Sequence, residues 1–531
     1  MNFSLPRACS PTKSLLIADM IKDKMDGQIA SCILQGIVNR TSDEKIYVMH
    51  TYCRDNGGNW EARERYRINK DENRSFNSFD FQVQMASTWL SEIYSDLPKS
   101  VLSPSDDLNY PMTLSLINRF SSYIKGLIIF DPYLPDATIE AGTTIAGQTD
   151  GIVVSPWLAE CLCDYNFPII EDLRNRFTGN IDCLDWLRNN YFEKANHDIA
   201  FTWSHMDLGP DSWGAANKDF VVANRLFTFY LDIHRKNELE HYPDVLRLYP
   251  EGTPIYGWTD ELVADAYFSR LGYFMVPMIS VENMTVHSSF DPIKFEPQNY
   301  PAPALETDAI YISFHIADGD NLLHSMVYEP NTIIKSKAFG KIPSTWILNP
   351  VLPEIAPRVM TWLRNKLDGV GDETASMTGD GHPSSERRRG FKFYCDYCAH
   401  YMEMSGMVTM KQMVEGEAVA WNIQPKALLG GYSGIDWRGI DIGDYHKDGK
   451  TFHVGSSCLG ETDIEGFISR CTGDKPTFIS IYAGTGSFDV CTRIEKYARE
   501  WTEMFPNKKL RFVLSCQLAD LYDQWIESCN Q

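Results

Sequence analysis

The sequence predicts an α/β protein with two parts: an N-terminal α/β layer domain over residues 1–300 and a C-terminal (β/α)-barrel-like domain over residues 305–531. Three observations support this prediction. The N-terminal half alternates short apolar runs with helical patterns, and the segment 290–307 contains four prolines, as linkers often do. The C-terminal half holds eight short apolar runs, most of them separated by helical patterns. A chain of 531 residues is also too long for one ordinary core.

In the N-terminal half, strand, helix and strand follow one another closely. The apolar runs 15–17 and 46–48 predict strands, and residues 29–38 between them have helical spacing. Such a short unit implies a parallel pair joined by a right-handed crossover. The polar segment 55–75 has no period and indicates a loop. The same strand–helix–strand order recurs over the segments 126–130, 141–147 and 151–154.

The eight apolar runs of the C-terminal half predict the strands of the barrel. They are 309–316, 345–348, 375–378, 407–410, 427–429, 452–455, 477–482 and 511–515. Helical patterns are present at 356–366, 395–404 and 493–504. Catalytic groups of such barrels lie at the carboxyl ends of the strands, so the residues after each run are the candidates for function.

Charge and composition exclude several classes of protein. A net charge of -22 argues against nucleic acid as the main partner, because phosphate binding needs clustered Lys and Arg. No apolar stretch approaches the roughly 20 residues of a membrane-spanning helix. No signal peptide is visible, which predicts a cytoplasmic protein unless a secreted chain has already been processed. Thirteen cysteines spread through apolar segments suit buried free thiols. We expect no cofactor, and the sequence does not indicate an oligomeric state.

Two carboxylates follow the first predicted strand of the barrel. If the strand continues that far, Asp318 and Asp320 point to the same side with Cα atoms about 6.6 to 6.8 Å apart. Gly319 lets the backbone turn or a ligand approach closely. Like charges this close push their pKa values apart, so one carboxyl could act as an acid while the other is ionised. The alternative is a polar turn followed by a helix N-cap.

Further polar and aromatic residues follow the later strands. Trp346 either offers a flat face to a sugar ring or belongs to the core. Glu354 either faces the aspartates or is favoured by the dipole of the helix that it opens. Aromatic, acidic and glycine residues on such loops are typical of a glycan cleft. The other loop candidates are Asp380, His382, Tyr432, Asp436 and Trp437, with Asn321 beside the aspartate pair.

Metal-assisted hydrolysis is a second possibility for the aspartates. Asp318 and Asp320 with His382 or His400 could hold an ion that activates water, as in a carbohydrate esterase. The sequence has no HExxH motif and no His pair at i,i+4 spacing, and a GxSxG motif is absent as well. Carboxylate chemistry without a metal is therefore favoured.

Many segments, in the same order along the chain, resemble the GxGYxYP family of glycoside hydrolases. In the N-terminal half they are 34–40, 130–132, 141–147, 172–174, 222–224, 257–258 and 283–288. In the C-terminal half they are 317–321, Trp346 with Pro350, 354–357 and 475–476. The resemblance implies an N-terminal α/β domain, a C-terminal barrel-like domain and a carbohydrate substrate. We also expect the N-terminal half to pack over the barrel mouth and to supply Asn283 or His287 to the rim of the cleft.

The family signature itself is altered in this sequence. Residues 379–385 keep both glycines, but His382 stands at the first tyrosine, Ser384 at the second and Ser385 at the proline. Two phenols are thereby lost from the expected cleft, so glycan binding without catalysis is the main alternative to hydrolysis.

For hydrolysis, we expect Asp320 to be the general acid and Asp318 to orient the substrate or stabilise positive charge. A third carboxylate, from Glu354, Asp380 or Asp436, should face them.

Overall fold

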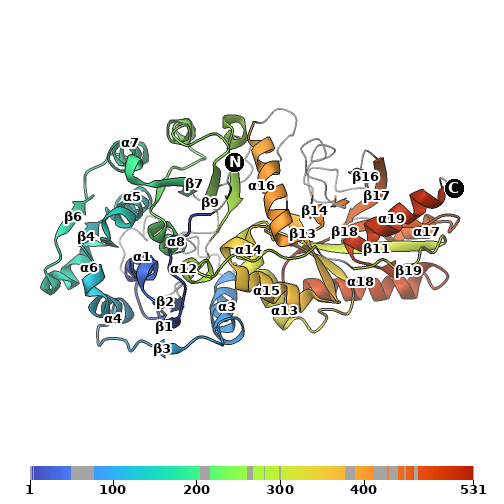
Figure 1. Cartoon of the computed structure of the whole chain (residues 1–531), viewed down its shortest axis with the longest axis horizontal. Coiled ribbons are helices and arrows are strands. Elements are labelled where there is room, and N and C mark those ends of the chain that lie inside the picture. Colours follow the sequence, from blue (N-terminus) through green and yellow to red (C-terminus); the bar gives the residue numbers. More distant parts are fainter. Residues whose placement is uncertain are drawn as a thin grey trace. The chain divides into compact units, whose positions relative to one another are not determined.

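The computed structural model describes residues 3, 5–49, 77–203, 216–259, 267–279, 281–297, 300–376, 389–411, 427–429, 441–447, 450–459 and 464–529. The chain divides into two compact units (Figure 1). The first comprises residues 1–291 with 355–357, and the second comprises residues 292–354 with 358–531. The predicted loop 55–75 lies outside the described residues.

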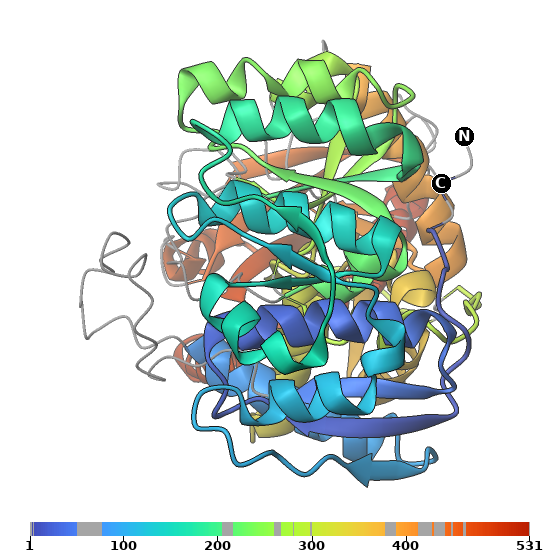
Figure 2. The ribbon, with the colours of Figure 1, turned by 90° about the vertical axis from the view of Figure 1, so that its left-hand side faces the viewer.

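The described residues of the first unit form three small parallel sheets (Figure 2). Their strand orders are β2-β1-β3, β5-β4-β6 and β10-β9-β7-β8. The strands are β1 (Ser14–Asp19), β2 (Glu44–Met49), β3 (Lys99–Val101), β4 (Leu127–Ile129), β5 (Ile152–Val154), β6 (Ile169–Asp172), β7 (Asn196–Trp203), β8 (Leu226–Tyr230), β9 (Pro254–Trp258) and β10 (Phe274–Pro277). The predicted parallel pairs are confirmed, because β1 pairs with β2 and β4 pairs with β5 in parallel.

Helices connect and cover these strands. They are α1 (Met25–Thr41), α3 (Asn77–Glu92), α4 (Pro111–Arg119), α5 (Pro135–Thr149), α6 (Pro156–Cys161), α7 (Asn180–Tyr191), α8 (Lys218–Ala223), α9 (Lys236–Leu239), α10 (Tyr242–Leu246) and α12 (Met284–His287). Short 3-10 turns lie at Ser121–Tyr123, Cys163–Tyr165 and Phe192–Lys194. Helix α1 is buried from residue 25 to residue 39 and packs against α8, β2 and β5, so it forms part of the core.

Buried polar side chains join distant parts of the first unit. Gln35 of α1 donates from Nε2 to Oδ1 of Asn283 at 2.7 Å, and Asn39 donates from Nδ2 to Oγ1 of Thr285 at 2.9 Å. Thr285 in turn donates to Oδ2 of Asp219 at 2.7 Å. Buried polar groups need such partners, so these bonds fix α1 against α12 and α8.

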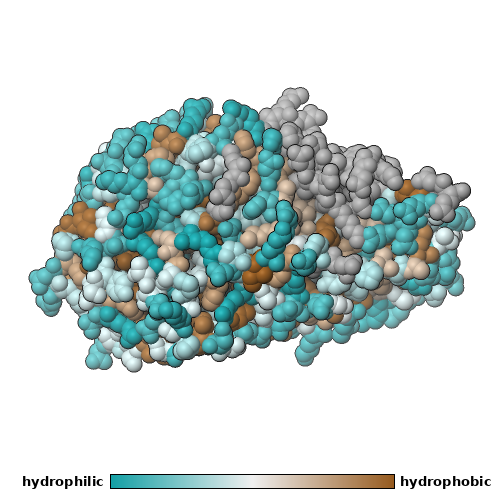
Figure 3. All heavy atoms as spheres, in the orientation of Figure 1, coloured by the Kyte–Doolittle hydropathy of each residue, from teal (hydrophilic) through white to brown (hydrophobic). Residues whose placement is uncertain are grey.

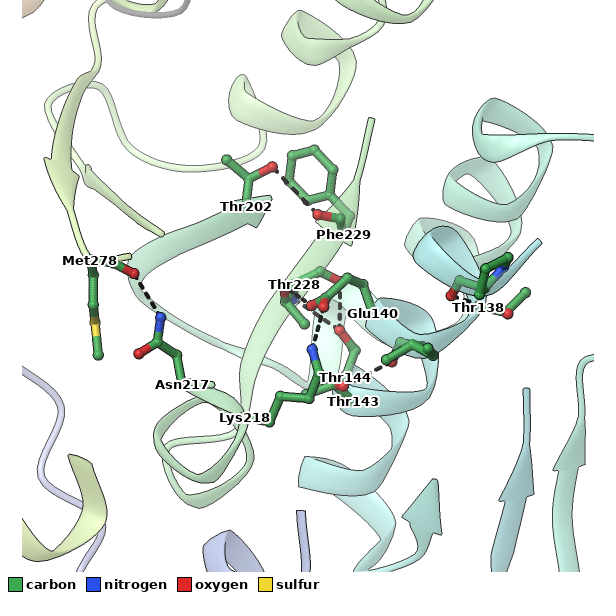
Figure 4. A network of polar contacts seen from close by, with 12 residues as sticks. Thr138, Glu140, Thr143, Thr144, Thr202, Asn217, Lys218, Thr228, Phe229 and Met278 are labelled. Carbon is green, nitrogen blue, oxygen red and sulfur yellow. Dashed lines mark hydrogen bonds and ion pairs between the residues drawn. The ribbon is translucent and has the colours of Figure 1, made fainter. Parts of the chain in front are cut away.

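A buried ion pair lies in the same unit. Figure 4 shows Lys218 of α8 directed at Glu140 of α5. The two side chains are only 2% and 8% exposed, and Thr228 of β8 donates a second hydrogen bond to Glu140 at 2.8 Å. The pair therefore joins two helices and a strand, and neither charge reaches bulk water.

The second unit is built on one large, mostly parallel sheet. The strand order is β15-β14-β13-β12-β11-β18-β17-β16, and β19 pairs with β11. The strands are β11 (Ala309–Ala317), β12 (Ser344–Leu348), β13 (Gly371–Ser376), β14 (Thr409–Lys411), β15 (Ala427–Leu429), β16 (Asp441–Lys447), β17 (Lys450–Cys458), β18 (Thr477–Thr485) and β19 (Lys509–Phe512). Because β15 comes close to β16, the sheet curls back on itself.

The helices of the second unit follow its strands. They are α13 (Glu329–Lys335), α14 (Leu352–Ile355), α15 (Pro357–Leu367), α16 (Arg389–Ser405), α17 (Ile464–Arg470), α18 (Val490–Met504) and α19 (Ser515–Cys529). A π-helical turn, η5 (His324–Tyr328), leads directly into α13.

The predicted α/β class and barrel-like second half are confirmed. The sheet differs from a regular eight-stranded barrel in two ways: β16, which was not predicted, forms an antiparallel hairpin with β17, and the pairing among the described strands leaves β15 and β16 as edges. Strand β13 begins before the predicted 375–378 and β19 before the predicted 511–515, where Ser515 already opens α19.

The described surface is mixed in character. Figure 3 shows hydrophilic residues over most of the visible face, with hydrophobic residues in small groups. None of the helices in the described part combines the length and apolar character that a bilayer crossing requires.

Candidate active site

The candidate site starts at the carboxyl end of β11. This strand is buried over its whole length and pairs in parallel with β12, β18 and β19. The strand stops at Ala317, because Asp318 takes a left-handed conformation with φ 72°. The backbone N–H of Asn321 then donates to the carbonyl of Asp318 at 3.2 Å. The two aspartates therefore lie on a tight turn, and not on an extension of the strand.

The backbone of this turn lies directly against β12. A Cβ atom at Gly319 would lie 1.5 Å from the carbonyl oxygen of Ile347, so only glycine fits. Ser325 donates from Oγ to the carbonyl of Gly319 at 2.5 Å. Asn349, just after β12, donates from Nδ2 to the carbonyl of Asp320 at 2.5 Å. These contacts fix the turn, and with it the positions of both carboxylates.

The residues of the turn differ in exposure. Asp318 is half-buried, whereas Asp320 is 7% exposed and Asn321 is 4% exposed. The Oδ1 atom of Asn321 accepts a hydrogen bond from the backbone N–H of Leu323 at 3.0 Å, as in a helix cap. Asp318 is thus the member of the aspartate pair with more access to a ligand.

A third carboxyl group, which the sequence did not indicate, belongs to the same cluster. Glu329 opens α13 and is 0% exposed, and its backbone N–H donates to the carbonyl of His324 in the π-helical turn. Its carboxyl oxygens have no hydrogen-bond partner among the described residues. Burial raises the pKa of Glu329 well above its usual value, and the charges of Asp318 and Asp320 raise it further.

Glu354 lies after the neighbouring strand. It is 6% exposed on α14, and the hydroxyl of Tyr401 on α16 donates to its Oε2 atom at 2.5 Å. Asn349 connects this segment to the aspartate turn, because its Oδ1 atom accepts from the backbone N–H of Val351 while its Nδ2 atom holds Asp320. That Glu354 faces Asp318 and Asp320 across a cleft stays a prediction.

Two predicted ligand residues have other roles in the structure. Trp346 is 0% exposed and packs edge-on against Phe339 at 6.0 Å, so its ring is part of the core and offers no face to a sugar. Asn283 is 2% exposed in the first unit. Its Oδ1 atom accepts from the backbone N–H of Val48 at 2.8 Å, and its Nδ2 atom donates to the carbonyl of Val48 at 2.9 Å. With Gln35 as a further partner, its amide is hydrogen-bonded within the first unit, and its contribution to a cleft rim stays a prediction.

His287 is also buried, at 3% exposure, and its Nδ1 atom is hydrogen-bonded to the hydroxyl of Tyr94 at 2.7 Å. Its place at a cleft rim stays a prediction. The remaining predicted residues lie outside the described part of the chain: Asp380, His382, Tyr432, Asp436 and Trp437. In the part that is described, no group of three or more His, Cys, Asp or Glu side chains has the arrangement of a metal site.

A mostly parallel α/β sheet with clustered carboxyl groups beyond the end of its central strand is an arrangement found in hydrolases. Family models match the chain in three places. "GxGYxYP_N second domain" matches residues 124–195, "GxGYxYP third domain" matches residues 201–289, and "GxGYxYP putative glycoside hydrolase C-terminal domain" matches residues 308–453. The chain belongs to the GxGYxYP family.

A solved structure is similar over nearly the whole chain. It is described as "a putative hydrolase from Bacteroides thetaiotaomicron VPI-5482", and the similarity covers 99% of each chain with a TM-score of 0.72 and 18% sequence identity. At this identity the similarity shows the fold alone. A comparison with curated proteins gave no match. The family match and the similar structure together support the assignment of this chain to the hydrolases in general.

Proposed function

We propose that the protein hydrolyses a glycosidic bond and that Asp318 and Asp320 take part in the reaction. The observation that carries this proposal is the carboxyl cluster formed by Asp318 and Asp320 on the turn after β11 and by Glu329 of α13, in which Asp318 is half-buried and the other two are buried. Glycoside hydrolysis needs two carboxyl groups with different protonation states, and unequal burial of close carboxyl groups is the usual means of separating them.

In the proposed mechanism, Asp320 protonates the leaving glycosidic oxygen. Asp320 is the more buried member of the pair, and the more exposed Asp318 stabilises the positive charge that develops on the sugar ring. Glu354, Asp380 or Asp436 then serves as nucleophile or as the base that activates water. A separation of about 5 to 5.5 Å between this group and Asp320 gives retention, and about 6.5 to 9.5 Å gives inversion.

The test begins with the purified chain and a panel of plant and microbial glycans. On any glycan that is cleaved, Asp320→Asn should lower turnover by about 10²- to 10⁴-fold, because the amide keeps the size but cannot donate the acid proton. Asp308→Asn is the matched control, since Asp308 is exposed at the opposite end of β11 and pairs with Lys509. Parental turnover by the folded Asp320→Asn variant would show that the turn is structural.

One observation favours a second function. His382 and Ser384 stand where the family signature has tyrosines, so the chain could bind a glycan without cleaving it. This alternative predicts affinity for a glycan of the panel without release of product. Loss of turnover on addition of a chelator would instead favour the metal-dependent esterase.

A further inference from the structure

We propose that Glu329 is a positioning residue of the aspartate pair, held as a neutral carboxylic acid between the turn after β11 and the turn after β18. The inference rests on the proposed function only in that the aspartates are taken as catalytic. It assigns to Glu329, which the sequence patterns did not single out, the role of a protonated side chain that positions the aspartate turn.

Two glycines make room for the Glu329 side chain. A Cβ atom built at Gly319 would lie 2.6 Å from Oε1 of Glu329, and one built at Gly486 would lie 2.8 Å from its Cγ. Thr332, one turn further along α13, donates from Oγ1 to the carbonyl of Gly486 at 3.3 Å. The side chain of Glu329 is thus enclosed by the backbone of both turns, and its carboxyl end contacts the turn that carries the aspartates.

Among the residues that the structure describes, no positively charged group is found to act on Glu329. The charged groups that act on it are Asp318 and Asp320, both acidic. His324 precedes it in the π-helical turn, and burial lowers the pKa of His324 to about 4, so this ring is neutral near neutral pH. On the β18 side, Glu329 meets Gly486, and Arg493 near that turn donates to the carbonyl of Leu459.

A negative charge on Glu329 would be costly at this place. An ionised carboxylate without hydrogen-bond donors is strongly destabilised in the interior, and negative charge on the aspartate pair adds to the cost. A neutral carboxylic acid avoids this cost and can donate its proton in a hydrogen bond. The π-helical turn supports the functional interpretation, since such segments occur frequently at functional sites.

Glu329→Gln and Glu329→Leu separate the chemical role from simple packing. The glutamine keeps the shape and the neutral state, so kcat should stay within a few-fold of the parent near neutral pH. The leucine removes every polar atom, so kcat should fall tenfold or more with little change in KM. If the leucine variant keeps the parental kcat while the aspartates prove catalytic, the positioning role is wrong.

Infrared spectroscopy and thermal unfolding test the protonation state without any substrate. The parent at neutral pH should show a protonated-carboxyl band that Glu329→Gln lacks. Its Tm should fall as the pH rises from about 5 to about 9, and this fall should be smaller in the glutamine variant. The sign follows from the raised pKa, because a native state that holds more protons loses stability as the pH rises.

The control is Asp372→Asn, a buried acid on β13 that is hydrogen-bonded to Thr345 and to the backbone of Cys516. The carboxyl band that disappears in Glu329→Gln should still be present in Asp372→Asn. An unchanged carboxyl band in Glu329→Gln, or an unchanged pH dependence of its Tm, would overturn the proposal. The carboxyl band and the pH dependence of Tm can be measured even if Asp320→Asn remains active. A failed prediction for Glu329 can therefore be distinguished from a failed prediction of glycoside hydrolysis.

Discussion

Replacing Gly319 by alanine tests how tightly the aspartate turn is fixed. The new methyl carbon would lie 1.5 Å from the carbonyl oxygen of Ile347, whereas real contacts of this kind hardly ever fall below 3.0 Å. The turn must therefore move by about 1.5 Å. Overpacking of this kind costs about 1–3 kcal/mol of stability. A displacement of about 1 Å in a catalytic group can cost about 100-fold in rate, so we expect at least that loss in kcat/KM.

The assay compares kcat/KM with the free energy of unfolding in urea. Gly473→Ala is the control: its Cβ atom would meet nothing within 4 Å, but the left-handed backbone with φ 81° should cost about 1–2 kcal/mol. The two variants should thus lose similar stability, and only Gly319→Ala should lose activity beyond its unfolded fraction. Parental activity in Gly319→Ala would refute the inference that contact with β12 positions the aspartates.

Two predictions concern the first unit. Lys218→Met should destabilise the protein by about 3–5 kcal/mol, because it leaves Glu140 buried without its countercharge. The control is Lys13→Met, which removes the exposed ion pair with Asp43 and should destabilise the protein by less than about 1 kcal/mol. Chemical unfolding of both variants measures the difference, and equal effects would contradict the reasoning. Burial lowers the pKa of His287 to about 3, so its contribution to stability should be lost as the pH falls from 6.5 towards 3, by at most about 1.4 kcal/mol per pH unit. This loss should be missing in His287→Asn, and an identical acid profile of that variant in pH-dependent unfolding would rule the contribution out.

Buried parallel strands were the most predictable part of the fold. Strand β11 is buried on both faces, so it is a continuous apolar run in the sequence. Strand β13 was predicted too late along the chain because its first half is polar. Asp372 and Glu373 are buried there, satisfied by Thr345 and by an ion pair with Arg364 at 2.8 Å. A strand whose acids find partners in the folded chain has no apolar pattern to detect.

The candidate site was predictable only in part, for a similar reason. Asp318 and Asp320 stand out because they follow an apolar run directly. Glu329 follows them by several residues and opens a helix, where an acidic residue is common, and its role depends on tertiary contact with Gly319 and Gly486. Local sequence could not decide whether Trp346 lies in the core or in a cleft, because both environments favour a large aromatic residue.

The hydrogen bonds from α1 to Asn283 and Thr285 limit how the protein can be cut for laboratory work. The matched second and third domains begin at residues 124 and 201, which suggests convenient starting points for expression. A fragment that begins at either position lacks Gln35 and Asn39, and therefore leaves the side chains of Asn283 and Thr285 without these buried partners. Such a fragment also lacks α1, so the buried residues of α8 that pack against this helix would be exposed, which favours aggregation over folding. A fragment from before β1 to residue 291 retains these contacts together with the continuous part of the first unit.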